Sequence, residues 1–295
     1  MRQFLILLIF LSPAALHASE INTFKDVFFK IPETTLGVLG KSVQKESLPY
    51  WGAIIGSTVL LYQYDESILL DTQRVGRKIG IGNDDSTSAV ITFQGSDVLR
   101  LPSDWGGAMY FLGDGWLHFG IAGGLLLYGK VAGESRPVRT SYQLIHGMAT
   151  STITSQLLKR TTGRESPFVR TEPGGDWYAF PSYSRYAGNT PKYDAFPSGH
   201  VMTATMTLTV LSNNYPEYRW IIRPVGIGLV SLLAWEMVNN GVHWASDYPL
   251  AIALGYMYGN EVSDHPGKYK KEKNYSFVPI VSDGHYGLTF AYSFQ

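Results

Sequence analysis

Cysteine is absent from the 295 residues, which excludes disulfides, thiolate metal sites and a cysteine nucleophile. Charge is scarce as well, because charged residues make up 16% of the chain and 24 basic residues balance 24 acidic ones. Nucleic-acid binding usually needs a basic surface, so this composition argues against it. Aromatic residues reach 14%, which would suit a membrane interface.

An uninterrupted apolar run of about 18 residues, the usual criterion for a membrane-spanning helix, is also missing. The best candidates, residues 107–129 and 221–238, contain Asp114 and Glu236. Two interpretations stay open. The helices form a soluble bundle, or they span a membrane with their polar residues turned toward an internal site.

The first residues are typical of a secretory signal peptide. Arg2 precedes an apolar run from Phe4 to Leu11, and Pro13 and small residues up to Ala18 follow. We expect residues 1–18 to be a signal peptide removed after export, because the run is short for a membrane anchor. An uncleaved anchor is the alternative.

The remaining pattern predicts a mainly α fold. Apolar segments expected to form helices cover residues 49–64, 107–130, 139–160, 197–213, 218–238 and 243–261. Residues 20–48 look like a surface segment with a short helix, and residues 74–104 predict short helices or loops. Residues 164–196, rich in Gly, Pro and Ser, predict a long functional loop. Alternating residues at 276–281 and 286–294 predict a C-terminal β-hairpin packed on the helices.

Three short segments carry groups suited to phosphate chemistry. The sequence Pro-Ser-Gly-His at 197–200 is expected to open a helix, where free N–H groups attract an anion. His243 and Asp247 are four residues apart, so on a helix they would share a face and the carboxylate could fix the imidazole tautomer. Lys159 and Arg160 close a predicted helix and could neutralise a phosphoryl group. Taken singly, each has an ordinary interpretation as a helix cap, a surface pair or a cation at a helix end.

In this order and spacing, the three segments resemble the motifs of the type-2 phosphatidic acid phosphatase and vanadium haloperoxidase superfamily. The family pattern is a lysine followed after six residues by Arg-Pro, then Pro-Ser-Gly-His, then Ser-Arg, five residues, His, three residues and Asp. Lys159 takes the lysine position, and PSGH and His-x-x-x-Asp are complete at 197–200 and 243–247. The resemblance implies a helical bundle of about six core helices of the acid phosphatase/vanadium haloperoxidase type. We expect it to cover residues 19–265, followed by a basic linker and the hairpin over residues 266–295.

Two arginines of the pattern are missing. Ser166 stands where the first motif has arginine, and Glu236-Met237 stand where the third has Ser-Arg. We expect Arg164 to replace one of them, because a guanidinium makes strong contacts to phosphate; the further candidates are Arg160, Arg170 and Arg185. The segment PKYDAFPSGH and the Asn-Asn-Gly before His243 look like those of a bacterial branch that shares this substitution.

The resemblance implies a phosphatase that hydrolyses a phosphate monoester or pyrophosphate, with lipid phosphates or isoprenoid pyrophosphates favoured. His243 would attack phosphorus and form a phosphohistidine, and Asp247 would orient its ring. His200 would protonate the leaving oxygen and later activate water. The phosphate oxygens would be held by Lys159, Arg164, Ser198 and the Gly199 N–H. No metal or other cofactor is expected, and vanadate would bind as a phosphate mimic.

We therefore expect a phosphorylated small-molecule or lipid substrate, a membrane as partner and no nucleic acid. The place of action would be the bacterial cell envelope, in the periplasm or at a membrane with the site facing the periplasm. Two other functions stay open. The missing arginines motivate a non-catalytic envelope protein that binds a phosphorylated lipid headgroup, and they count against a vanadate-dependent haloperoxidase. His118 and His146 are expected in the core of the bundle.

Overall fold

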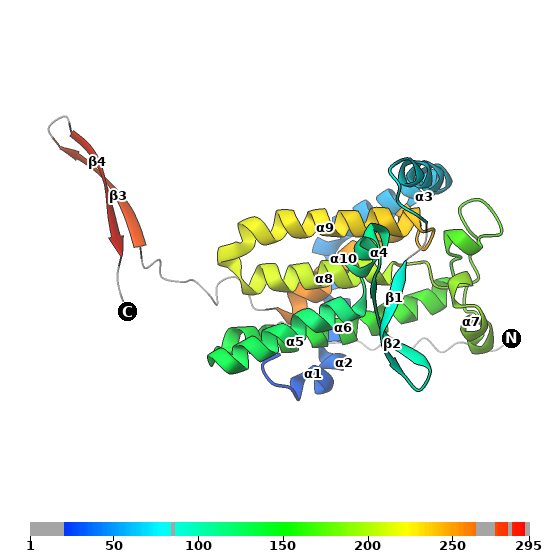
Figure 1. Cartoon of the computed structure of the whole chain (residues 1–295), viewed down its shortest axis with the longest axis horizontal. Coiled ribbons are helices and arrows are strands. Elements are labelled where there is room, and N and C mark those ends of the chain that lie inside the picture. The colour runs from blue at the N-terminus through cyan, green and yellow to red at the C-terminus, as the bar shows by residue number, and fades with distance from the viewer. Residues whose placement is uncertain (1–20, 84–85, 264–274, 283–284, 293–295) are drawn as a thin grey trace.

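The computed structural model describes residues 21–83, 86–263, 275–282 and 285–292, and these are mainly helical. The six longest helices after residue 47 are α3 (Leu48–Lys78), α5 (Gly115–Ala132), α6 (Ser135–Thr162), α8 (Gly199–Asn214), α9 (Arg219–Asn239) and α10 (Tyr248–Val262). In Figure 1, α5, α6, α8 and α9 run alongside one another. The predicted mainly helical fold with about six core helices is confirmed.

Shorter helices complete the bundle. Two helices, α1 (Asp26–Phe29) and α2 (Ile31–Ser42), replace the single one expected near the start. The apolar stretch expected as one helix over residues 107–130 is divided into α4 (Trp105–Phe111) and α5. The division lies at Asp114, whose side chain caps α5 by accepting a 2.7 Å hydrogen bond from the Trp116 N–H. One-turn helices are η1 (Lys45–Ser47), η2 (Pro167–Val169), α7 (Tyr183–Gly188), η3 (Thr190–Lys192), η4 (Pro216–Tyr218) and η5 (Ala245–Asp247).

A β-hairpin stands where short helices or loops were expected, so that prediction is wrong for most of residues 74–104. Strands β1 (Thr87–Phe93) and β2 (Ser96–Pro102) pair antiparallel. They are joined by a two-residue turn in which Gln94 has φ 49° and Gly95 has φ 78°. Positive φ at both central residues gives the turn the twist that a hairpin needs. The run TSAVITF was therefore a strand signal.

The core is centred on α8, which packs against α6, α9 and α10. One apolar cluster includes Met206 and Tyr258, and a second includes Met202 and Met237. The approach of α10 to α8 depends on glycine. A methyl group on Gly259 would lie 2.5 Å from the Thr209 Cβ, so the two backbones come too close for a larger residue.

At one end of the bundle, three connections between helices lie close together. The last turn of α6, the first turn of α8 and the connection from α9 to α10 all lie at the end occupied by α7 in Figure 1. Gly163 ends α6 with φ 60°, and a Cβ there would collide with the Tyr178 carbonyl. This glycine stop directs the chain into the loop of residues 164–198, which packs over the same end.

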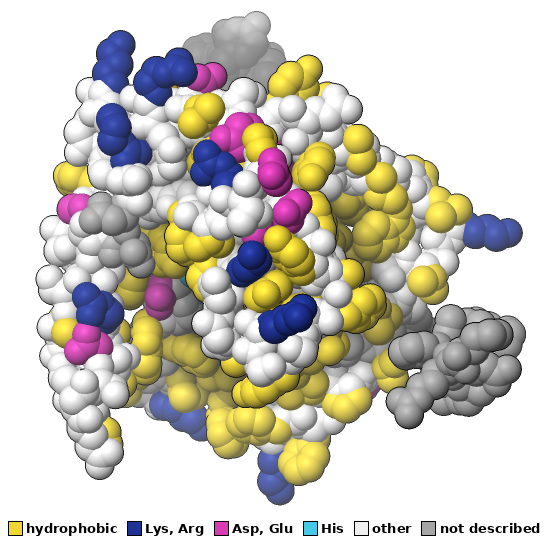
Figure 2. Space-filling view, turned by 90° about the vertical axis from the view of Figure 1, so that its right-hand side faces the viewer, with side chains coloured by type: hydrophobic (Ala, Val, Ile, Leu, Met, Phe, Trp, Pro, Cys, Tyr) yellow, Lys and Arg dark blue, Asp and Glu magenta, His cyan; other side chains and the backbone are white. Residues whose placement is uncertain are grey.

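Exposed apolar side chains cover the outer faces of several helices. Large examples on α9 are Trp220 and Ile227, which are 76% and 59% exposed. Figure 2, which looks onto the loop end of the bundle, shows hydrophobic side chains gathered along the flank of the molecule. Among the described residues, the stretch Pro216–Asn239 is the one helix that is long and apolar enough to cross a membrane. A contiguous apolar surface of this kind is unusual for a protein surrounded by water.

The predicted C-terminal hairpin is confirmed as β3 (Tyr275–Ser282) and β4 (His285–Tyr292), which pair antiparallel. Figure 1 draws it apart from the helices, so the expected packing on the bundle is not seen there. The predicted signal peptide, residues 1–18, lies outside the described residues.

Candidate active site

The start of α8 is built as the PSGH motif predicts. Ser198 is the N-cap residue, and its Oγ accepts a 3.4 Å hydrogen bond from the Val201 N–H. The Ser198 backbone N–H donates to the Asp247 carbonyl oxygen at 3.3 Å. This bond ties the second motif to the third. The first N–H groups of a helix have no partner within the helix, so they are available to an anion here.

Two side chains from α6 face this helix start. A methyl group on Gly199 would lie 3.7 Å from Ser155 Oγ and 3.9 Å from Lys159 Nζ. Lys159 is 6% exposed and forms a 3.3 Å ion pair with Asp194. Ser155 is 2% exposed, and its hydroxyl has no hydrogen-bond partner among the described residues. One ammonium and one unpaired hydroxyl, spaced one helical turn apart, therefore lie beside the free N–H groups of α8.

His243 and Asp247 meet across a turn, not on a shared helix face. His243 lies between α9 and η5, where its backbone N–H donates to the Met237 carbonyl at 3.2 Å. Its Nδ1 faces Asp247 Oδ2 at 3.4 Å, and the same oxygen accepts a 2.8 Å hydrogen bond from the Trp244 N–H. The helix predicted from residue 243 begins only at Tyr248, because Pro249 sits at its first turn. The predicted pairing is present in a different local structure.

His200 completes the group of titratable side chains. Its ring centroid lies 6.3 Å from that of His243 and 5.1 Å from that of Tyr110. The pKa of His200 is lowered to about 3, first by withdrawal of the ring from water and then by the nearby His243 and Lys159. The imidazole of His200 is therefore neutral at physiological pH.

Arg164 lies behind the His243–Asp247 pair, so the expectation that it holds phosphate is not supported. It is completely buried. Its Nη1 donates to Asp247 Oδ1 at 2.5 Å and its Nη2 donates to Asp65 Oδ2 at 2.7 Å. Further hydrogen bonds from the same guanidinium reach the Ser246 hydroxyl and the Gly174 carbonyl at 2.7 Å and 2.9 Å. With both terminal nitrogens occupied, Arg164 is placed to fix the carboxylate that faces His243.

Asp65 of α3 bonds both to Arg164 and to Ser246, the residue before Asp247. Its Oδ1 accepts a 3.0 Å hydrogen bond from the Ser246 N–H, and its Oδ2 accepts one of 2.5 Å from the Ser246 hydroxyl. Asp65 and Asp247 are both completely shielded from solvent or nearly so, at 1% and 0% exposure. Two buried carboxylates share one guanidinium, and their hydrogen bonds to the turn offset the cost of burying the charges.

The loop before α8 is organised around Glu165. Burial alone would raise the pKa of this carboxyl, but the backbone N–H groups of Thr171 and Asp176 donate to it and lower the pKa below its ordinary value. Its backbone carbonyl accepts a 2.8 Å hydrogen bond from Trp244 Nε1. The Glu165 carboxylate thus orders the loop, and the Glu165 carbonyl joins the loop to the turn that carries His243.

The positions of the two missing arginines hold no cation. Met237 is completely buried in the apolar cluster with Leu233 and Met202. Ser166 is 2% exposed, and its backbone N–H donates to the Pro191 carbonyl at 2.9 Å. The neighbouring Glu236 is buried and accepts 3.3 Å hydrogen bonds from Asn239.

The other arginine candidates lie away from the histidines. Arg160 donates to Gln156 and stacks over the ring of Tyr186 at 4.3 Å. Arg170 forms a 2.7 Å ion pair with Glu66, and Arg185 is exposed on α7. Lys159 is thus the predicted cation that the structure brings next to the start of α8. No group of three or more His, Asp or Glu side chains within the described ranges could hold a metal ion.

The comparison with protein families agrees with these motifs. The model described as the PAP2 superfamily matches residues 141–267, a segment that contains Lys159, PSGH and the His243–Asp247 pair. This part of the chain belongs to the PAP2 superfamily. The family expected from the sequence is therefore confirmed, and the PAP2 segment extends from the second turn of α6 past the end of α10.

A solved structure is also similar to the chain. It is titled the first transmembrane PAP2 type phosphatidylglycerolphosphate phosphatase from Bacillus subtilis. The two chains are 16% identical with a TM-score of 0.43, over 71% of this chain and 92% of that one. No curated protein gives a significant match.

Asp65, Ser155 and Ser246 were not expected at the site. Asp65 and Ser155 lie outside the three motifs, and Ser246 gives no distinct signal within the third. One hint was available, since the acidic pair Asp65-Glu66 interrupts the apolar run of α3. His118 and His146 are buried as expected. His118 contacts Thr207 of α8, and His146 joins α6 to Thr34 and to the Val27 carbonyl.

Proposed function

We propose that the chain is a phosphatase that hydrolyses a phosphate monoester or pyrophosphate through a phosphohistidine at His243. The observation that carries this proposal is that His243, whose Nδ1 faces Asp247, lies next to His200 at the start of α8. A nucleophile, an orienting carboxylate and a proton carrier are the parts that such a reaction requires.

In the first step, Nε2 of His243 attacks phosphorus and the bond from phosphorus to the leaving oxygen breaks. Asp247 accepts the Nδ1 hydrogen of His243, so that the other nitrogen carries the lone pair. The bound phosphate dianion favours protonation of His200, and His200 then gives this proton to the leaving oxygen.

In the second step, a water oxygen attacks phosphorus while neutral His200 takes a proton from that water. The N–P bond breaks, and inorganic phosphate and free His243 result. The Lys159 ammonium and the first N–H groups of α8 stabilise the charge that develops on the phosphoryl oxygens. Ser155 and Ser198 supply hydroxyls to the same oxygens. Arg164 holds Asp247 and touches no oxygen of the substrate.

Lipid phosphates and isoprenoid pyrophosphates are the substrates that we favour. The support comes from the exposed apolar faces of the bundle, which suit a membrane-associated protein. Export to the cell envelope, with the site facing the periplasm, is part of the same proposal. It rests on the apolar run near the N-terminus.

The assay is release of inorganic phosphate from a chromogenic phosphate ester and from a phosphorylated lipid in detergent micelles. The proposal predicts turnover that vanadate inhibits and that His243→Ala abolishes. Turnover that survives His243→Ala would show that another group is the nucleophile.

A non-catalytic phosphate-binding protein is the second candidate. Its support is Met237, an apolar side chain at a position where the family pattern has arginine. This candidate predicts that a phosphorylated lipid binds to the full-length protein but that no ester or pyrophosphate is hydrolysed. Phosphate release that depends on His243 would exclude it.

A further inference from the structure

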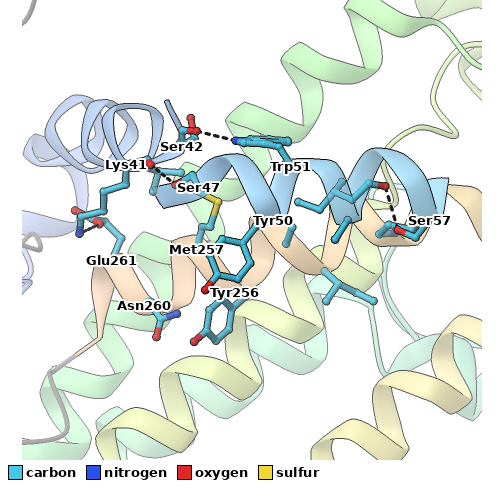
Figure 3. A pocket seen from close by; sticks show the side chains of 16 residues that line it. Lys41, Ser42, Ser47, Tyr50, Trp51, Ser57, Tyr256, Met257, Asn260 and Glu261 are labelled. Carbon is cyan, nitrogen blue, oxygen red and sulfur yellow. Dashed lines mark hydrogen bonds and ion pairs between the residues drawn. The ribbon is translucent and has the colours of Figure 1, made fainter. Parts of the chain in front are cut away.

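A long apolar groove runs between α2, α3 and α10, apart from the catalytic group. It has a volume of about 700 Å³, within the range of about 300–1,000 Å³ typical of ligand sites. Figure 3 shows α3 and α10 contributing side chains to the same hollow. The apolar lining includes Val38, Trp51, Ile54, Ile252, Ala253 and Met257.

The groove is separate from the phosphate site, because it uses the opposite side of α10. Ile252 and Tyr256 line the groove, whereas Gly255 and Gly259 pack against α8. Along α10 the lining extends from Pro249 to Glu261. At a rise of 1.5 Å per residue this corresponds to about 18 Å, which is somewhat more than half of the ~30 Å hydrocarbon core of a bilayer.

One end of the groove is polar. Lys41 Nζ forms a 2.6 Å ion pair with Glu261 Oε2, and the two side chains are 37% and 2% exposed. The Lys41 ammonium has three hydrogens, so it can donate to a further anion while it remains paired. Tyr50 and Tyr256, both more than half exposed, line the groove near this end. Rings with an apolar body and a polar tip are favoured at the boundary between hydrocarbon and water.

The lining identifies the chemistry of the occupant. Both long walls are helices, whose backbone N–H and C=O groups are paired within the helix. A peptide laid in this groove would lose the hydration of its own backbone without gaining partners, whereas a hydrocarbon chain needs none. Ile252, which lines the groove, is 46% exposed, and Ile55, next to the lining residue Ile54, is 60% exposed. Exposed apolar side chains thus lie both in the groove and beside it.

We propose that this groove holds one hydrocarbon chain of a membrane phospholipid, with the phosphate headgroup at Lys41. The lipid would be a resident one, bound next to the catalytic bundle and not turned over by it. It would hold α2 and α3 against α10. It would thereby keep α3 in the position from which Asp65 accepts its hydrogen bonds from Ser246. This binding does not depend on whether the catalytic site is active.

The test uses a phosphatidylglycerol with a photoreactive diazirine in one acyl chain. The full-length protein in detergent micelles, with this lipid at low mole fraction, is irradiated, and the labelled peptides are identified by mass spectrometry. The groove predicts saturable labelling in residues 50–57 and 249–257, which an excess of ordinary phosphatidylglycerol suppresses.

Ala253→Phe fills the groove from α10 and is expected to weaken the saturable labelling by about tenfold, because contacts with several methylene groups are lost. Val59→Phe is the matched control, since Val59 is 53% exposed on α3 and is not part of the lining. It should leave the labelling unchanged. Helical content by circular dichroism establishes that both variants are folded.

Even, non-saturable labelling of the outer faces of α3, α5 and α9, unaffected by Ala253→Phe, would overturn the proposal. So would a dimer whose contact peptides are those of the groove, since a second copy would then be the occupant. Loss of phosphatase activity in every preparation would leave the labelling pattern unaffected, and it would bear on the catalytic proposal alone.

Discussion

Arg164 donates a 2.5 Å hydrogen bond from Nη1 to Oδ1 of Asp247, and the other oxygen of this carboxylate faces Nδ1 of His243 at 3.4 Å. The guanidinium is completely buried and also binds Asp65. In the proposed mechanism, Arg164 would therefore act through the orientation and charge of Asp247 and would not contact the phosphate itself.

Arg164→Lys should lower kcat and leave the inhibition constant of vanadate nearly unchanged. Lysine keeps the positive charge between the two carboxylates but lacks the two separate nitrogens that bond Asp247 and Asp65, so Asp247 is held less firmly. Steady-state kinetics on a chromogenic ester, with vanadate as inhibitor, separate the two effects. A rise in the inhibition constant that parallels the loss of kcat would mean that Arg164 contacts the phosphoryl group directly.

Ser155→Ala should weaken the binding of phosphate or vanadate by about tenfold, because a hydrogen bond to a charged ligand is lost. The free energy of unfolding of the ligand-free protein should not fall, since the buried Ser155 hydroxyl has no hydrogen-bond partner among the described residues to lose. Ser151→Ala, one turn earlier on α6, is the control, because the Ser151 hydroxyl bonds to the Met148 carbonyl. Equal inhibition constants for Ser155→Ala and the wild type would remove Ser155 from the site.

Phosphate binding should strengthen as the pH falls from about 8 to 6. His200 is neutral in the empty site, where its pKa is about 3, and a bound dianion raises that pKa, so binding takes up a proton. The inhibition constant of phosphate, measured across this range, is compared with that of His200→Asn. The variant should lose most of the pH dependence, apart from the titration of phosphate itself. Identical slopes for both proteins would show that His200 does not take up the proton.

Asp65→Asn should destabilise the fold by about 1–3 kcal/mol, because Arg164 loses one of its two buried carboxylate partners. Glu66→Gln is the matched control from the next residue. It removes an ion pair with Arg170 in which both side chains are about 30% exposed, so a loss of at most about 1 kcal/mol is expected. Denaturant unfolding of the two variants gives the comparison. Equal losses would mean that the buried network contributes no more than a surface pair.

The sequence predicts the part of the site that depends on short spacing. PSGH opens α8, Lys159 lies in the last turn of α6, and His243 faces Asp247, because each of these relationships is local or belongs to a motif. The partner of Arg164 could not be predicted. Asp65 is 99 residues away from it, and no local pattern indicates that α3 will pack beneath the turn at Ser246.

The fold shows the same division. Helical periodicity predicts the positions of the main helices, although α3 extends to Lys78 and not to residue 64. The β1–β2 hairpin was missed because the polar residues around it suggested loops. Its short alternating run and the positive φ of Gln94 and Gly95 determine the strand pairing instead.

The most direct measurement for the catalytic proposal is a search for the covalent intermediate. The protein is mixed with ³²P-labelled nitrophenyl phosphate, whose leaving group needs no proton, and quenched in alkali, and the labelled peptide is sequenced. The phosphohistidine mechanism predicts label on His243 that rises in His200→Asn, because with this substrate the intermediate forms without a proton from His200 while its hydrolysis is slowed. Phosphate release without any label on His243 in either protein would contradict it.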